Sequence, residues 1–184
     1  MDSVLDAIAA IASRAAGSWL GMLLITSPIW LLAAVRVWQA LRRRRAFQAF
    51  AAAQPELHFV GTIPSDARLP YSRVERVRRQ VLLSNVVEGR WDGLPVHLFD
   101  TARGRDPRWT MILVTVEDML HRGAEAERIV AAGPAALIEF SLDVLSVSPQ
   151  RSLDTSELTA WLTFATTLAK AMERDAKAAF AARR

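Results

Sequence analysis

The chain contains no cysteine among its 184 residues. It therefore has no disulfide, no thiolate metal ligand and no cysteine nucleophile. It also lacks the glycine-rich phosphate-binding patterns and the serine elbow of many nucleotide-binding enzymes and hydrolases. Its three histidines, His58, His97 and His121, have no partner at metal-ligand spacing. We therefore expect no catalytic residue, no cofactor and no metal, and a protein that is not an enzyme.

Charge is missing from one long stretch near the start of the chain. The 21 residues of Ala15–Val35 carry no charged side chain. As a helix this stretch would be about 31 Å long, close to the thickness of the hydrocarbon layer of a membrane. The pattern predicts a single transmembrane helix over residues 15–35. A buried core helix and a cleaved signal peptide are the alternatives, although the leader carries Asp2 and Asp6 and has no basic segment.

The two flanks of this stretch differ in charge. Five arginines and no acidic residue lie between positions 36 and 55, whereas the leader has two acids and one arginine. Arginines favour the cytoplasmic side, so residues 1–14 are predicted to lie outside and the rest in the cytoplasm, at a bacterial inner membrane. Tryptophans suit the membrane interface. The predicted membrane-interface residues are Trp19, Arg36, Trp38, Arg42, Arg43, Arg44 and Arg45.

Small residues recur at intervals of four on the predicted membrane helix. Ser13, Gly17 and Gly21 fall on one face, and a stripe of this kind lets a second helix approach closely. The predicted partners are therefore membrane lipid and either an integral membrane protein or a second copy of the chain. The basic residues lie where anionic headgroups would attract them, so we expect no nucleic-acid partner.

The remainder of the chain predicts an α+β fold. A basic juxtamembrane helix is expected over 36–54, an α+β domain over 55–175 and a basic tail over 176–184. Strand patterns occupy 56–62, 81–91, 94–100, 109–117 and 136–148, which makes an antiparallel sheet of about four to five strands. Asp92-Gly93 is a strong hairpin signal, because a type I′ turn needs positive φ at both positions.

Two helices are expected in this domain, a short one over 125–132 and a longer one at the C-terminus. Asp154 and Glu157 have the spacing of a capping box, which places the start of the second helix. Its apolar face is predicted to cover the sheet and consists of Leu158, Trp161, Leu162, Ala165, Leu168 and Met172.

The hairpin segment carries a pattern of its own, formed by Asn85, Gly89, Trp91, Gly93, Val96, Phe99 and Asp100, with Thr110 after a polar loop. This pattern resembles a recurring core of uncharacterised bacterial membrane-anchored proteins, N-x-x-x-G-x-W/Y-x-G-x-x-V-x-x-F-D. The resemblance covers about residues 80–172 and implies an α+β domain with an antiparallel sheet. It implies no activity. The chain departs from the pattern in its short 101–108 loop.

Few residues remain as candidates for chemistry. His97 and Asp100 are close in sequence, but residues three apart on a strand point to opposite faces, which argues against an acid–base pair. Trp91 and Trp109 are either buried hairpin core or exposed anchors of a partner surface. Arg103 and Arg105 belong either to a solvated loop or to a contact surface. The sequence favours a membrane-anchored accessory or scaffold protein. A membrane-tethered enzyme or ligand-binding domain is the alternative, and a nucleic-acid binder is a weaker one.

Overall fold

A computed structural model describes residues 19–64, 82–101 and 109–182 of the chain. The chain forms two compact units, Met1–Arg43 and Arg44–Arg184. In the first, the described part is the beginning of α2 (Trp19–Ala52), a continuous α-helix that includes Pro28. The last turns of α2 belong to the second unit, where Phe47 and Ala51 are buried in the core. The helix expected over 36–54 is thus present, but the domain begins before the predicted residue 55.

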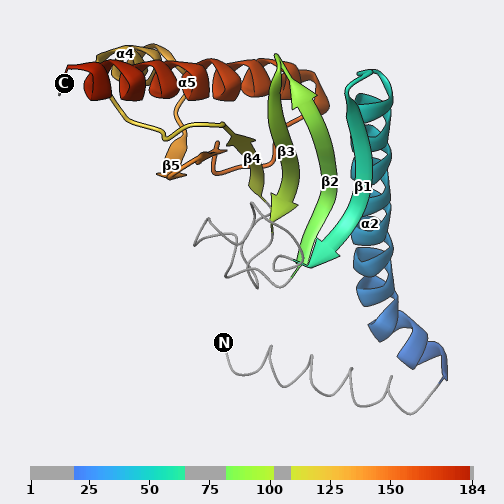
Figure 1. Cartoon of the computed structure of the whole chain (residues 1–184). Coiled ribbons are helices and arrows are strands. Elements are labelled where there is room, and N and C mark those ends of the chain that lie inside the picture. Colours follow the sequence, from blue (N-terminus) through green and yellow to red (C-terminus); the bar gives the residue numbers. More distant parts are fainter. Residues whose placement is uncertain (1–18, 65–81, 102–108, 183–184) are drawn as a thin grey trace, which may run out of the picture. The chain divides into compact units, whose positions relative to one another are not determined.

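The second unit is built on one antiparallel sheet of six strands in the order β1-β2-β3-β4-β6-β5 (Figure 1). The strands are β1 (Leu57–Pro64), β2 (Leu82–Trp91), β3 (Leu94–Thr101), β4 (Trp109–Thr115), β5 (Leu137–Ser141) and β6 (Val144–Ser148). The helices are the end of α2, α4 (Ala124–Ala132) and α5 (Thr155–Ala181). The predicted α+β class with a C-terminal helix over an antiparallel sheet is therefore confirmed.

The β2–β3 hairpin forms as the sequence predicts. Asp92 and Gly93 both have positive φ, 52° and 81°, and they join the paired residues Trp91 and Leu94. Gly89 has a φ of 153°, and a Cβ there would lie 1.9 Å from the carbonyl oxygen of Glu56. Glycine at this position therefore lets the chain before β1 approach β2 closely.

The sheet has six strands rather than the expected four to five, because residues 136–148 are not one strand. They fold into the β5–β6 hairpin, in which Ser141 pairs with Val144. Leu142 makes the turn with a φ of 48°, a conformation that leucine rarely adopts. The segment contains no glycine or asparagine at this point, so the usual turn signal is missing.

Helices cover one face of the sheet. The predicted apolar residues of α5 are all buried, and they pack with Val96, Leu98, Ile112 and Leu145 of the strands. Neighbouring residues on the same strands, such as Phe99 and Leu113, point to the opposite face and form a second buried cluster. No described helix contributes to that second cluster. The core thus has two layers, one on each face of the sheet.

The start and the end of α5 differ in how well they were predicted. The capping box is present, with the Asp154 N–H donating to Glu157 Oε2 at 3.0 Å. The helix then continues to Ala181, so most of the tail predicted over 176–184 is helical. Figure 1 shows α4 alongside α5. Asp175 of α5 accepts hydrogen bonds from the first amides of α4, at 3.0 Å for the Ala126 N–H. This contact replaces the N-cap side chain that α4 lacks at Gly123.

The transmembrane helix predicted over 15–35 is not found among the described residues. In that part of the chain, no helix has an apolar stretch of the length and hydropathy that a membrane crossing needs. Positions 15–18, where the predicted stretch begins, lie outside the described residues.

Candidate partner-binding groove

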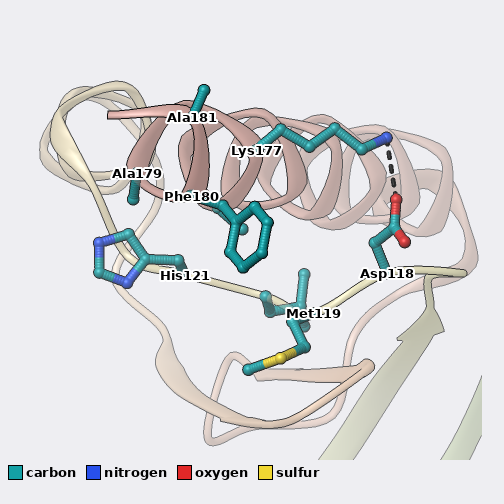
Figure 2. Close-up of a pocket in the computed structure, with 9 residues that line it drawn as sticks. Asp118, Met119, His121, Lys177, Ala179, Phe180 and Ala181 are labelled. Carbon is teal, nitrogen blue, oxygen red and sulfur yellow. Dashed lines mark ion pairs between the residues drawn. The ribbon is translucent and has the colours of Figure 1, made fainter. Parts of the chain in front are cut away.

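A groove lies between the segment that follows β4 and the last turns of α5 (Figure 2). Two backbone hydrogen bonds hold this segment in place. The Leu120 N–H donates to the Leu142 carbonyl at 2.7 Å, and the His121 N–H donates to the Met172 carbonyl at 3.2 Å. Leu120 is itself buried in the core. One side of the groove is therefore fixed between the β5–β6 turn and α5, although it has no regular secondary structure.

The lining of the groove is mostly apolar. Its volume is about 660 Å³, and its lining residues are Asp118, Met119, Leu120, His121, Ala176, Lys177, Ala179, Phe180 and Ala181. Met119 and Phe180 are exposed by 66% and 65%, and Figure 2 shows both beside the open space. Large exposed apolar side chains gathered at a hollow are typical of binding surfaces.

An ion pair forms the polar edge of the groove. Lys177 Nζ lies 3.0 Å from Asp118 Oδ2 and 2.7 Å from Glu173 Oε1. The hydrogen bond to Glu173, with a smaller effect from the one to Asp118, raises the pKa of Lys177, so its ammonium group stays charged at neutral pH. The carboxylates already satisfy this charge, which leaves the apolar surface as the principal attraction for a ligand.

The groove does not carry an obvious catalytic constellation. Its titratable residues are the paired Lys177 and Asp118, together with His121. Across residues 19–64, 82–101 and 109–182, no group of three histidine, aspartate or glutamate side chains is placed to hold a metal ion. The arrangement suits the binding of an apolar side chain or helix face better than acid–base chemistry.

A buried polar cluster lies elsewhere in the domain, where β2, β3 and β4 meet the entry to α5. Asp100 is 1% exposed, and its carboxylate accepts hydrogen bonds from Asn85 Nδ2 at 2.8 Å and from Thr110 Oγ1 at 3.1 Å. Thr110 Oγ1 also accepts the Leu153 N–H at 2.9 Å. The asparagine, aspartate and threonine of the sequence pattern thus converge. Because Leu153 lies just before α5, its hydrogen bond to Thr110 connects the sheet to the start of that helix. The Asp100 carboxylate is buried within this connection.

His97 does not join this cluster. Its Nδ1 lies 3.7 Å from Glu88 Oε1, its partner in the β2–β3 register. Asp100 points to the other face of β3, as the spacing of three predicts. The two side chains therefore do not form an acid–base pair, which agrees with the expectation from sequence.

The residues predicted as a partner surface occupy different surroundings. Trp91 is half-buried; its ring centroid lies 6.4 Å from that of Phe50, and its Nε1–H donates to Thr163 Oγ1 at 3.2 Å. Trp91 therefore packs at the border of the core. Trp109, at the start of β4, is also half-buried. The other two predicted residues, Arg103 and Arg105, lie outside the described part of the chain.

The predicted membrane-interface residues belong to α2. Trp38 is 59% exposed, and the Arg42 guanidinium lies 5.5 Å from the centre of its ring. Arg36 and Arg45 are also exposed, Arg43 is half-buried, and exposed Arg44 lies 5.8 Å from the ring centre of Phe59. Trp19 and Gly21 lie in the described helix backbone, whereas Ser13 and Gly17 are outside it.

The sequence did not identify the groove, because no single motif encodes it. One of its sides is an irregular segment that is fixed by backbone hydrogen bonds to distant residues. The other side consists of the last turns of α5, which lie within the tail predicted over residues 176–184. The recurrence of Met172, Ala176 and Phe180 at intervals of four is the one signal that would have extended α5.

Comparisons of the chain with protein-family models, with curated proteins and with solved structures find no match. The groove and the surface of α2 therefore carry the functional argument.

Proposed function

We propose that the chain is a membrane-anchored accessory protein of a bacterial inner membrane. The N-terminal part of α2 would be its anchor, and the α+β domain would bind an integral membrane partner on the cytoplasmic side. The observation that carries this proposal is the exposure of large apolar side chains along α2. They are Ile29, Trp30, Leu31, Leu32, Val35, Val37, Trp38 and Leu41.

The distribution of these side chains favours lipid over a protein surface. Ile29, Trp30, Leu31 and Leu32 are consecutive and 64–71% exposed. Successive residues on a helix are about 100° apart, so these four surround it. One flat partner face would cover only part of such a surface, whereas lipid tails would cover all of it. Burial of an aliphatic side chain of this size is worth about 1.5–3 kcal/mol, so leaving this stretch in water would be costly.

The charges support the proposed orientation. Arginine is the only charged residue type between positions 36 and 55, which favours a cytoplasmic location for the domain and an external location for residues 1–14. The predicted stripe of Ser13, Gly17 and Gly21 would let a partner helix, or a second copy of α2, pack closely within the membrane.

The groove is the surface through which the domain would bind its partner. We expect the occupant to be an apolar segment on the cytoplasmic side of an integral membrane protein, because the groove is lined by Met119, Phe180 and alanines. The alternative of a membrane-tethered enzyme or small-ligand binder gains less support, because most of the residues that line the groove are apolar and few polar groups there could orient a substrate.

Affinity capture tests this proposal. The full chain with a C-terminal tag would be extracted from native membranes in mild detergent, and the co-purifying proteins would be identified by mass spectrometry. We expect a stoichiometric integral membrane protein. Met119→Asp should release it, whereas the matched control Ala135→Asp, at an exposed site outside the groove, should retain it. A chain that purifies alone, or a partner that both variants retain equally, would contradict the proposal.

A further inference from the structure

We infer that Trp38 and Arg42 of α2 form a site for the phosphate of an anionic phospholipid. The inference rests on the proposed membrane anchor and specifies which lipid the anchor prefers. Its basis is the contact between the two side chains, in which the guanidinium carbon lies 5.5 Å from the indole centre. A guanidinium group that stacks on a ring leaves the N–H groups at its edge available. Those groups match two phosphate oxygens in a bidentate arrangement.

The order of residues along α2 matches the layers of a membrane. The stretch without charged residues ends at Val35, Trp38 follows one turn later, and Arg42 follows after one further turn. At about 1.5 Å per residue, Trp38 lies about 4.5 Å and Arg42 about 10 Å beyond Val35. The headgroup layer is about 5–8 Å thick on each side. The indole would thus lie at the interface, where tryptophan is enriched.

The direction of the Arg42 side chain brings its charge to the same layer. Side chains on a helix lean toward its N-terminus, and Arg42 accordingly reaches back over Trp38. In the proposed orientation, this direction is toward the membrane. The guanidinium would therefore meet the lipid phosphates although the Arg42 backbone lies beyond them.

The surrounding charge explains the preference for an anionic lipid. All five charged residues between positions 36 and 55 are arginines. A zwitterionic headgroup would bring its own cation into this positive field, whereas an anionic headgroup would not. Two of the five arginines lie over an aromatic ring, Arg42 over Trp38 and Arg44 over Phe59 of β1. Only Arg42 and its ring both belong to α2 beside the uncharged stretch, so this site differs from general attraction to a charged surface.

The test uses the full chain reconstituted into vesicles made of equal parts phosphatidylcholine and phosphatidylglycerol. After gentle extraction, native mass spectrometry gives the ratio of the two lipids that the protein retains. We expect enrichment of phosphatidylglycerol in the wild type. Arg42→Gln should reduce the enrichment about fivefold, and Trp38→Leu, which keeps the charge, about twofold.

Arg36→Gln is the matched control. It removes the same charge from an exposed position that lies about 200° around the helix from Trp38. A loss of enrichment equal to that of Arg42→Gln would overturn the site, as would a Trp38→Leu protein that retains lipid like the wild type. Flotation of the vesicles reports insertion separately. If the chain inserts without enriching phosphatidylglycerol, only this inference fails; if it does not insert, the proposed anchor fails as well.

Discussion

Replacement of Thr110 by valine tests whether the buried polar cluster connects the sheet to α5. The substitution keeps the shape of the side chain and removes one hydroxyl group. That hydroxyl donates to the Asp100 carboxylate at 3.1 Å and accepts the Leu153 N–H at 2.9 Å. Residue 110 is fully buried, so water cannot replace either bond from bulk solvent.

The expected cost follows from the two lost interactions. A hydrogen bond to a charged group contributes about 1.5–3 kcal/mol, and a buried amide left without a partner costs about 1–3 kcal/mol. Because relaxation recovers part of this sum, we expect Thr110→Val to lower the free energy of unfolding by about 2–5 kcal/mol. Thr110→Ser is the control, since it keeps the hydroxyl and loses one methyl group, at a cost of about 1 kcal/mol.

Urea unfolding of the full chain in mild detergent, followed by near-UV circular dichroism, measures both variants. Hydrogen exchange adds a local observation, because the Leu153 amide should lose protection in Thr110→Val and keep it in Thr110→Ser. If the two variants unfold at the same urea concentration, or if Leu153 stays protected in both, the reasoning is refuted.

Three further predictions concern the backbone and the charged contacts of the domain. Gly89→Ala should lower the free energy of unfolding by more than about 3 kcal/mol, because the new Cβ would lie 1.9 Å from a backbone carbonyl oxygen. Gly93→Ala is the control in the same urea unfolding experiment. It should cost only about 1–2 kcal/mol, because φ is also positive at Gly93 but no atom lies within 4 Å of the added Cβ. Asp175→Ala should cost about 1 kcal/mol and expose the first amides of α4 to hydrogen exchange, whereas Asp175→Asn should keep part of that protection. The hydrogen bond from Arg151 lowers the pKa of Glu157 from 4.5 to about 2. The stability that the Glu157 carboxylate adds to the folded state should therefore be fully present above pH 4.5 and lost as the pH falls toward 2. In urea unfolding, the difference in the free energy of unfolding between wild type and Glu157→Gln should therefore shrink between pH 4.5 and about pH 2. A difference that stays constant over this range would contradict the prediction.

Local chemistry allowed part of the fold to be predicted from the sequence. Asp92-Gly93 specified a hairpin because the turn type requires residues that tolerate positive φ, and both have it. The capping box of Asp154 and Glu157 placed the start of α5, since both of its hydrogen bonds are local. The buried face of α5 followed from its helical periodicity.

Features that depend on distant contacts could not be predicted in the same way. Leu142 adopts a positive φ because the β5–β6 hairpin and the Leu120 amide fix its backbone, and leucine itself gives no turn signal. The convergence of Asn85, Asp100 and Thr110 depends on the strand register. A sequence shows these three residue types, but it does not show that they share one hydrogen-bond network.

The membrane helix was predicted neither from local turn or capping chemistry nor from distant contacts, but from the absence of charged residues over 15–35. The exposed apolar side chains of α2 motivate the same proposal on independent grounds, namely that they surround the helix. The natural lack of cysteine also gives the experiment that tests this claim most directly, because a single introduced cysteine would be the sole thiol in the chain.

That measurement is thiol labelling with a membrane-impermeant maleimide in bacterial spheroplasts, combined with an alkaline carbonate wash of the membranes. Ser3→Cys reports on the N-terminal segment and Ala135→Cys, at an exposed site, reports on the domain. The account predicts a chain that resists the wash, with Ser3→Cys labelled in intact spheroplasts and Ala135→Cys labelled only after lysis. Release of the chain by carbonate, or labelling of the domain before lysis, would contradict a cytoplasmic domain on a membrane anchor.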